Sequence, residues 1–364
     1  MPSPVFCATR EIVSSKSMRN SVSKMRIGGL LVLFSLLLVG CERPLEYDRF
    51  EGATMGTYYR VTALCPRGGG LPLQRELEAE LERVNAQMST YQPDSELMRF
   101  NASEPGVWVP ASSDLVAVIA AAKEISRWSE GAFDVTVSAL VDLWGFGPGG
   151  HISDRPSEAA IAELLGYMGD EHLEIDPEAP SILRRTPLQV DLSAIAKGHG
   201  VDRLGNLLQR QACEDFLVDI GGEVKGQGVS PSGRRWRVGV EVPDPARVGG
   251  VQKVLPLDSM AVATSGDYRN FLDLADGRYS HTLDPRTGYP VRHDLASVSV
   301  LHPSAMWADG LATALNVLGP DDGFDLAEER DLAAFFLIRR PNGFEERYTS
   351  AMAQYLEQMA ESSQ

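Results

Sequence analysis

Two oxygen-bearing side chains stand four residues apart in a segment whose pattern predicts a helix. Asp309 and Thr313 therefore share one helix face, where a carboxylate and a hydroxyl oxygen together suit a hard cation such as Mg²⁺. The same spacing also fits an aspartate that interacts only with the positive end of a helix. Because Mg²⁺ usually takes one or two protein groups and completes its shell with phosphate oxygens and water, the metal hypothesis requires a ligand that carries phosphate.

A histidine and an aspartate occupy a stretch upstream of that helix that is rich in Asp, Thr and Gly. His281 and Asp284 belong to the run His281–Gly288, which predicts a tight turn between two strands. An imidazole titrates near neutral pH and suits a general base, so His281 and then Asp284 are the candidates for that role. A histidine at a strand end can equally make a structural hydrogen bond, and the pattern leaves both interpretations open.

Five further short clusters combine Gly, Asp, Thr and other small residues. Each cluster alone is typical of a solvent-exposed turn, so the information lies in their order along one chain. The clusters are Ala53–Thr57, Gly131–Val137, Asp191–Gly198, Asp219–Gly222 and Ala263–Asp267.

The common nucleotide-binding signatures are absent from the sequence or stand in the wrong context. Gly145–Gly150 matches G-x-G-x-x-G, but it contains Pro148 and leads into His151–Arg155, which does not predict the start of a helix. We interpret it as a Gly-rich turn. The sequence contains no P-loop, H-E-x-x-H, C-x-x-C or G-x-S-x-G motif, so a bound nucleotide would be held in an uncommon way.

The clusters, in this order, resemble the FAD:protein FMN transferase family of ApbE-type lipoproteins. The similarity runs from about Phe50 to Leu318 and rests on T-M-G-T, S-T-Y, G-A-F-D-x-T-V, D-L-S-x-I-A-K-G, D-I-G-G, A-T-S-G-D-Y-R and H-x-L-D-P-x-T-G. It implies an α+β fold, with a single large catalytic domain of mixed and antiparallel sheets and packed helices. The implied reaction is a Mg²⁺-dependent transfer of FMN from FAD to a threonine hydroxyl of an acceptor flavoprotein, with release of AMP.

The resemblance also implies roles for individual residues. Contacts to FAD fall on Met55, Tyr91, Ala132, Phe133, Asp134, Asp191, Lys197 and Leu283. The Mg²⁺ ligands fall on Asp309, Thr313 and the backbone carbonyl of Ala194, with Lys197 as an aid in neutralising phosphate charge. Some members carry another Asp just before the residue that corresponds to Thr313, where this chain has Ala312. The number of metal ions, one or two, therefore remains open.

The resemblance implies acceptors as well, and it leaves other functions open. The implied acceptors are the flavin subunits of sodium- or proton-linked membrane electron-transfer complexes of the Nqr and Rnf kind. An FAD pyrophosphatase would use the same site to release FMN and AMP to water. A non-enzymatic flavin-binding lipoprotein would only hold the ligand.

The overall charge excludes one class of partner. The formal net charge is −16, and residues 1–40 are net basic, so the rest of the chain is more acidic still. Binding to nucleic acid requires Lys and Arg to replace phosphate counterions, so we expect no nucleic-acid partner. A polyanionic ligand such as a dinucleotide would need a local cation or a metal ion.

The front end of the chain predicts an export signal over residues 1–40. The apolar run 27–40 follows Lys24 and Arg26, is shorter than the roughly 20 residues of a membrane-spanning helix, and ends in L-V-G-C. This ending resembles a lipobox, so we expect lipidation of Cys41, with residues 41–50 as a tether. Met25 is an alternative start, and an anchor helix that ends in a chance Cys is the alternative interpretation.

Export has two further consequences for the expected protein. A lipid anchor places it on the periplasmic side of the cell inner membrane, although sorting to the outer membrane stays open. An oxidising compartment permits a disulfide between Cys65 and Cys213, but two buried free thiols fit the sequence equally well.

Periodicity predicts the elements that position these residues. Leucines at spacings of three and four predict a helix over 73–89, and further helices are predicted from Ser112 or Ser113 to about Trp128, over 194–210, and from the cap Ser304 to about Leu318. Strands are predicted at 57–63, 188–192, 216–220, 236–242, 260–264, 271–274, 297–301 and 333–339, with hairpin turns at 275–277 and 341–343. Strands that cluster in the C-terminal half favour α+β over a regular α/β alternation. We expect the catalytic domain to span 51–350, with a C-terminal helix or tail over 351–364.

Overall fold

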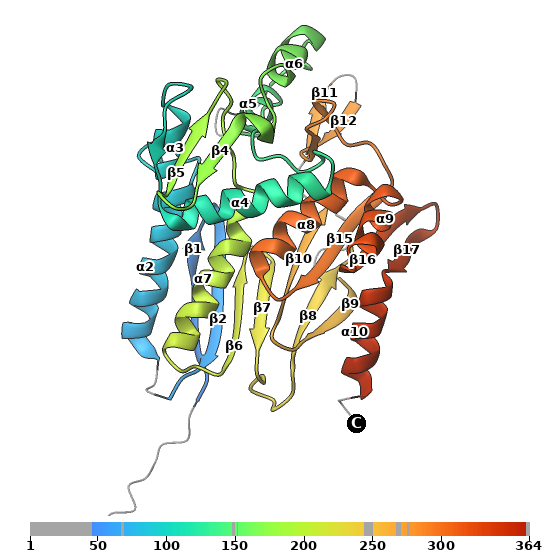
Figure 1. The fold of residues 1–364 in the computed structure, drawn as a ribbon. Coiled ribbons are helices and arrows are strands. Elements are labelled where there is room, and N and C mark those ends of the chain that lie inside the picture. The colour runs from blue at the N-terminus through green and yellow to red at the C-terminus, as the bar shows by residue number, and fades with distance from the viewer. Residues whose placement is uncertain are drawn as a thin grey trace, which may run out of the picture. The chain divides into compact units, whose positions relative to one another are not determined.

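A large antiparallel sheet runs through the part of the chain that the computed structural model describes, which is residues 46–361 without 67–68, 148–149, 151, 244–249, 267–270 and 275–276 (Figure 1). Its described strands number eight. In spatial order they are β1 (Asp48–Thr54), β2 (Thr57–Leu64), β6 (Asp215–Ile220), β7 (Glu223–Gln227), β10 (Met260–Gly266), β15 (Leu295–His302), β16 (Ala333–Arg340) and β17 (Gly343–Tyr348).

Both faces of this sheet carry apolar side chains, and each face is covered by other elements. On β16, Phe336 faces a core that lies under helices, whereas Phe335 and Leu337 face a second core on the opposite side. Successive residues of a strand point to opposite faces, so a strand that is apolar on both faces must be covered on both.

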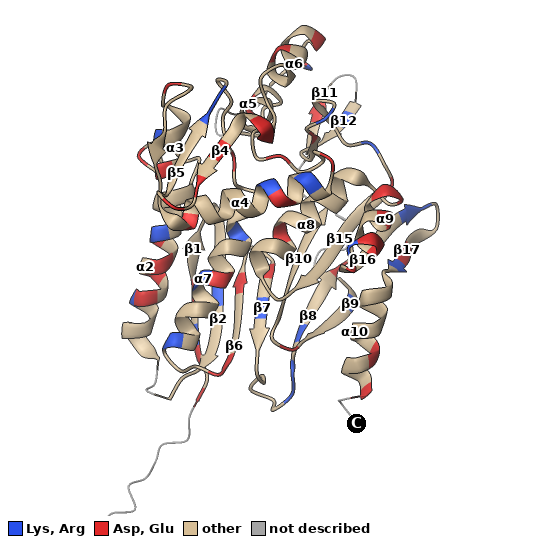
Figure 2. Cartoon of the chain, viewed as in Figure 1, with Lys and Arg blue, Asp and Glu red and all other residues tan. Residues whose placement is uncertain are grey.

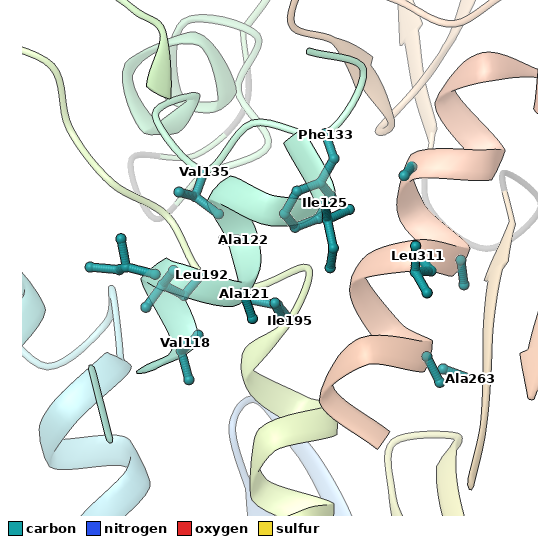
Figure 3. Close-up of a cluster of buried hydrophobic side chains, with 14 of the residues drawn as sticks. Val118, Ala121, Ala122, Ile125, Phe133, Val135, Leu192, Ile195, Ala263 and Leu311 are labelled. Carbon is teal, nitrogen blue, oxygen red and sulfur yellow. The ribbon is translucent and has the colours of Figure 1, made fainter. Parts of the chain in front are cut away.

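Four helices form the layer that carries the functional loops. They are α2 (Gly70–Met88), α4 (Ser113–Trp128), α7 (Ala196–Arg210) and α8 (Ala305–Leu318). Helices α7 and α8 pack against each other, α7 covers β6 and β7, and α8 covers β10 and β15. Figure 3 shows the core that joins them, with Val118 and Ile125 of α4 opposite Leu311 of α8.

A hairpin and the last helix cover the opposite face. The hairpin strands are β8 (Trp236–Glu241) and β9 (Val251–Leu257), and the helix is α10 (Ser350–Glu361). Trp236, Leu257 and Met352 from these elements pack in one buried cluster with Phe335 of the sheet.

Smaller elements stand above the helical layer in the view of Figure 1. They are α3 (Glu96–Asn101), β3 (Val109–Pro110), α5 (Ser138–Leu143), α6 (Glu158–Leu165), the 3₁₀ turn Asp170–His172, β4 (Leu173–Asp176), β5 (Ser181–Arg184), β11 (Phe271–Leu274), β12 (Gly277–Ser280), β13 (Leu283–Asp284) and β14 (Tyr289–Pro290). The remaining helix, α9 (Asp322–Glu329), packs on α8 and β16. Buried Trp144 anchors the upper part, since its indole N–H donates to the Gly288 carbonyl at 2.9 Å.

The α+β fold predicted from the sequence is confirmed, and most of the predicted elements are present within a few residues. The caps agree as well, because Ser112 and Ser304 accept backbone N–H groups from the first turns of α4 and α8. The hairpin turn at 341–343 is confirmed by the pairing of Arg340 with Gly343. Strands β11 and β12 pair on either side of the turn predicted at 275–277. Residues 275 and 276 of that turn lie outside the described part.

The strand predicted at 188–192 is wrong. Only Gln189 pairs with another strand-like residue, in an isolated bridge to Val137. The buried side chain of Asn101 takes the place of a neighbouring strand, because its amide donates to the Val190 carbonyl at 2.9 Å and accepts from the Val190 N–H at 2.8 Å. The backbone of this segment is thus satisfied without a ladder.

Two boundaries also differ from the prediction. The helix predicted over 194–210 begins at Ala196, so Ala194 lies in the loop that precedes it. Strand β1 begins at Asp48, so the last residues of the expected tether belong to the sheet.

The expected signal segment, Cys41 and residues 42–45 of the tether lie outside the described residues. Within the described part, the structure contains no helix with the length and apolar character needed to cross a membrane. A disulfide joins Cys65 to Cys213, which decides the alternative that the sequence left open.

Candidate active site

Two adjoining cavities open among the described residues at the start of α7, and the larger one extends along α8. Their volumes are about 370 and 230 Å³, and both are lined by Ser193 and Lys197. The predicted site residues that line the larger cavity are Ala132, Phe133, Asp134, Asp191, Ala194, Lys197, His281, Leu283, Asp309 and Thr313. Those that line the smaller one are Met55, Tyr91 and Lys197.

Loops far apart in the sequence reach this place because the elements that carry them are neighbours in the fold. Strands β6 and β7 meet at the turn Gly221-Gly222, whose Gly221 lines the larger cavity, and the end of β10 lies beside it. Helix α8 crosses over β10, so Asp309 and Thr313 face the same space.

Three charged side chains meet in the wall of the larger cavity. The ammonium of Lys197 lies 3.5 Å from Glu223 Oε1 and 3.7 Å from Asp309 Oδ1. The backbone N–H of Gly198 donates to Asp309 Oδ2 at 3.0 Å. Glu223 and Asp309 are each 5% exposed, and Glu223 Oε2 has no hydrogen-bond partner among the described residues.

Burial and charge pull the pKa values of this cluster in opposite directions. Burial raises the pKa of Glu223 to about 8, although Lys197 partly offsets this, and burial likewise raises the pKa of Asp309. Burial lowers the pKa of Lys197, but the neighbouring Asp309 and Glu223 more than compensate and raise it above its ordinary value. Lys197 is therefore a stable cation beside the cavity.

The oxygen atoms here fit a Mg²⁺ ion that also binds phosphate. Asp309, Thr313 and the loop residue Ala194 line one cavity and offer a carboxylate, a hydroxyl and a carbonyl, all of them hard oxygen donors. Within the described part of the chain, no group of three or more His, Cys, Asp or Glu residues is placed to hold a metal ion. A metal at Asp309 would therefore depend on ligand oxygens to complete its shell, as the sequence predicted.

His281 and Asp284 lie in different surroundings, although they are close in sequence. His281 lines the larger cavity and its ring lies edge-on to Phe146, with centroids 6.4 Å apart. Asp284 does not line either cavity, and its carboxylate oxygens accept from the Arg286 guanidinium at 2.9 Å and from the Arg286 N–H at 3.0 Å. The geometry thus favours His281 for the base and gives Asp284 the task of closing the turn.

A hydrogen bond joins the loop of His281 to the helix of Asp309. Asn316 of α8 is fully buried, and its amide donates to Thr282 Oγ1 at 3.4 Å. Nε2 of His293 also lies 2.8 Å from the backbone carbonyl oxygen of Asn316. Because Thr282 lines the larger cavity, this contact holds the loop of His281 against α8.

Two aspartates line the floor of the larger cavity and organise their own loops. Asp191 Oδ1 accepts from the Ser193 N–H at 2.7 Å, and Asp134 Oδ1 accepts from the Thr136 N–H at 2.7 Å. Burial raises the pKa of Asp134 to about 6, against the opposing effect of its hydrogen bonds from Thr136.

The smaller cavity combines an exposed aromatic ring with a tightly placed methionine. Tyr91 is 70% exposed, so its ring is available to a ligand and is not part of the core. Met55 occupies the tight turn between β1 and β2 with φ of 48°. A Cβ on Gly200 would come within 2.8 Å of the Met55 methyl carbon, so the glycine of α7 makes room for this side chain.

Sequence reasoning missed Glu223, Thr282 and Asn316. Glu223 directly follows the D-I-G-G motif, and this adjacency is the signal that could have found it. The sequence contains no comparable signal for Thr282 and Asn316, since their contact joins residues 34 positions apart.

Comparisons with known proteins find similar chains over most of this sequence. The model of the ApbE family matches residues 55–336. The FAD:protein FMN transferase of Haemophilus influenzae is 37% identical over 92% of this chain and 99% of its own length, and that of Vibrio cholerae is 40% identical over 90% and 98%. Among solved structures, the flavin transferase ApbE from Vibrio cholerae has a TM-score of 0.79 and 38% identity, covering 85% of this chain and 99% of that one. The apo form of Pseudomonas stutzeri flavinyl transferase ApbE has a TM-score of 0.78 and 40% identity, covering 85% and 97%.

Proposed function

Because this chain belongs to the ApbE family and is an FAD:protein FMN transferase, we propose that it uses Mg²⁺ to move FMN onto a threonine hydroxyl of its acceptor. One observation carries the proposal. Asp309 and Thr313 on one face of α8, the cation Lys197 and the imidazole of His281 all line a single cavity.

The proposed reaction is a phosphoryl transfer within the pyrophosphate of FAD. The acceptor oxygen forms a bond to the FMN phosphorus, the bond from that phosphorus to the bridging oxygen breaks, and AMP leaves with the bridging oxygen. Catalysis of this kind depends on positioning and on neutralisation of charge at the phosphate oxygens. A bound Mg²⁺ would supply most of that neutralisation from Asp309, Thr313 and the Ala194 carbonyl.

The protein's own side chains have separate tasks in this scheme. Lys197 presents a second positive charge at the boundary of the two cavities. His281 accepts the proton of the acceptor hydroxyl. The hydroxyl is a poor nucleophile until a base removes this proton. Tyr91 and Met55 bind the part of FAD that extends into the smaller cavity.

The decisive experiment is mass spectrometry of an acceptor peptide after incubation with the protein, FAD and Mg²⁺. We expect the peptide to gain one FMN at its threonine and AMP to appear in equal amount. Release of FMN and AMP with an unmodified peptide would instead identify an FAD pyrophosphatase. Full transfer in excess EDTA, or by Asp309→Ala at ordinary Mg²⁺, would refute the metal site.

We further propose that the chain is lipidated at Cys41 and acts at the periplasmic side of the inner membrane, on flavin subunits of Nqr- or Rnf-like complexes. The L-V-G-C sequence supports the anchor, and the Cys65–Cys213 disulfide suits an oxidising compartment. Mass spectrometry of the mature N-terminus tests this. A mature protein that retains an unmodified Cys41 would refute the anchor, and Cys41→Ala should yield a soluble or unprocessed chain.

A further inference from the structure

Glu223 stands in the cavity wall in surroundings that are unfavourable for a carboxylate. It is 5% exposed, and its Oε2 has no hydrogen-bond partner among the described residues. A buried polar atom without a partner costs free energy, so the contribution of Glu223 to stability does not explain its presence. Its other oxygen, Oε1, lies 3.5 Å from the Lys197 ammonium.

Lys197 lies between two carboxylates on different elements. Glu223 is the first residue of β7 and Asp309 lies on α8, while Lys197 belongs to the first turn of α7. The two separations from the ammonium differ little, at 3.5 and 3.7 Å. Asp309 also accepts the Gly198 N–H, whereas Glu223 Oε1 has the ammonium as its ion-pair partner among the described residues.

This arrangement matters once a cation binds to Asp309. A metal ion at that carboxylate and the ammonium of Lys197 would be like charges a few ångströms apart, in a place that water screens poorly. Lys197 can stay at the cavity only if another anion stabilises it, and Glu223 is the other carboxylate within ion-pair distance among the described residues.

We propose that Glu223 is a positioning residue that holds Lys197 at the cavity wall and thereby leaves Asp309 available to the metal ion. The inference rests on the metal site proposed above. Without the Glu223 charge, Lys197 pairs with Asp309 alone and competes with the metal for that carboxylate.

The test measures metal binding directly, with Mn²⁺ as the probe and without acceptor, both in the absence of nucleotide and with ADP, whose phosphates supply the ligand oxygens that the site is expected to need. Mn²⁺ shares the preference of Mg²⁺ for oxygen ligands, and the paramagnetic resonance signal of the free ion falls as it binds. Glu223→Gln keeps the shape of the side chain and removes its charge. We expect its Mn²⁺ dissociation constant to rise about ten- to a hundredfold, because the ammonium of Lys197 would then pair with Asp309 and oppose the ion at short range in a partly screened site.

Glu80→Gln is the matched control. Glu80 of α2 is 4% exposed and accepts from Arg203 Nε at 2.6 Å, so this variant also breaks a buried ion pair. Glu80 does not line either cavity, and its variant should lose stability and keep the wild-type Mn²⁺ affinity.

Lys197→Met separates an effect through the lysine from a direct effect on the metal. Lys197→Met alone should tighten Mn²⁺ binding, because a competing cation is gone. In that background the added change Glu223→Gln should have much less effect than in the wild type. An equal loss in both backgrounds would show that Glu223 acts on the metal itself and would overturn the proposal.

Other outcomes are equally decisive. A Glu223→Gln variant with an unchanged Mn²⁺ affinity overturns the inference, while a wild type that binds no more Mn²⁺ than Asp309→Ala, either without nucleotide or with ADP, refutes the metal site on which it rests. If Glu223→Gln does not fold, Lys197→Met carries the test, and unchanged or weaker Mn²⁺ binding in that variant overturns the inference.

Discussion

At the scale of single residues, the cavity holds polar groups in states that folding alone would not favour. Burial raises the pKa values of Glu223, Asp309 and Asp134, so each carboxylate is less stable as an anion here than in water. Groups of this kind, gathered in one cavity, are typical of sites that bind charged ligands. A cation near Asp309 would relieve part of this cost, which links the buried carboxylates to the proposed metal-dependent phosphoryl transfer.

His281 provides the first test at this scale. A general base contributes typically 10²–10⁴-fold, so His281→Ala should lower turnover by about that factor while FAD still binds. Activity of the wild type should fall as acid protonates the imidazole, and the variant should lose that dependence. Turnover numbers across pH and FAD binding by flavin fluorescence measure the two effects. Near-normal turnover would remove His281 from the mechanism, and loss of folding would assign it a structural role.

Asp134 provides a test of stability against pH. Its pKa is raised from its ordinary value near 4 to about 6 in the folded chain, chiefly by burial. The folded state therefore binds this proton more tightly than the unfolded state does. The resulting stabilisation of the fold is complete below pH 4 and disappears as the pH rises through 6. Relative to Asp134→Asn, the ligand-free wild type should lose about 2 kcal/mol of unfolding free energy between pH 4 and pH 7. Urea denaturation at several pH values measures this difference, and a difference that does not vary with pH would contradict it.

Residues inside motifs or at helical spacing could be singled out from the sequence. Lys197 was assigned from D-L-S-x-I-A-K-G and Asp309 from its spacing to Thr313 on a predicted helix, and both line the larger cavity. Glu223 escaped notice because its importance comes from a contact with Lys197 across the fold, and a single acid after two glycines is common in turns. The bond between Asn316 and Thr282 is invisible in the sequence for the same reason.

At the scale of elements, the site depends on how closely α7 approaches α8. Gly198 stands at this crossing, where an added Cβ would lie 2.2 Å from the Ala305 carbonyl oxygen and 2.8 Å from the Asp309 Cβ. The first of these atoms is backbone and cannot turn away. Any side chain at this position must push the two helices apart and move Asp309.

Gly198→Ala should therefore destabilise the fold and impair transfer together. We expect a loss of about 1–3 kcal/mol in unfolding free energy, as for other overpacked cores, and weaker metal binding. Gly205→Ala on the same helix is the control, because its added Cβ would meet atoms at 3.6 Å, and alanine favours a helix by up to about 1 kcal/mol. Thermal unfolding and Mn²⁺ titration of both variants decide the matter. Equal behaviour of the two would show that the close approach is unimportant.

The elements that the sequence missed share a physical reason. Strand β7, with the sequence EVKGQ, lacks a regular alternation of apolar residues, and β9 contains Pro256. Strand β1 is polar at most positions and lies at the edge of the sheet, where pairing on one side is enough. Such strands form because neighbouring strands offer hydrogen bonds. Helices α4 and α8, in contrast, can be recognised in the sequence from their N-caps and apolar faces.

At the scale of the whole molecule, the sheet order joins segments that are remote in sequence. Strand β2 pairs with β6 across a segment that contains α2, α4 and α7, and β7 pairs with β10 across the β8–β9 hairpin. Local patterns cannot specify such pairings, because they depend on which faces the helices cover. The sequence thus predicted the class of fold and most elements, while the order that brings the loops around one cavity came from the structure. Acidic and basic residues are interspersed on α2 and α4 (Figure 2), in keeping with a solvated outer surface.

The Cys65–Cys213 disulfide fastens the first of these long-range pairings. Cys65 directly follows β2 and Cys213 precedes β6, next to the pairing of Leu64 with Asp215. The bond spans 148 residues of sequence, a segment that contains α2, α4 and the loops of Asp134 and Asp191. A crosslink over such a long loop restricts the unfolded chain strongly, whereas neither cysteine lines the cavities.

The double substitution Cys65→Ala and Cys213→Ala should therefore cost stability and spare the chemistry. We expect the unfolding free energy to fall by about 2–5 kcal/mol, with turnover near that of the wild type at temperatures where both proteins are folded. Urea denaturation with and without a reductant measures the first effect, and the reductant should weaken the wild type and leave the double variant unchanged. A folded double variant with low turnover would contradict this division, because it would mean that the crosslink holds the cavity loops in place as well as the sheet.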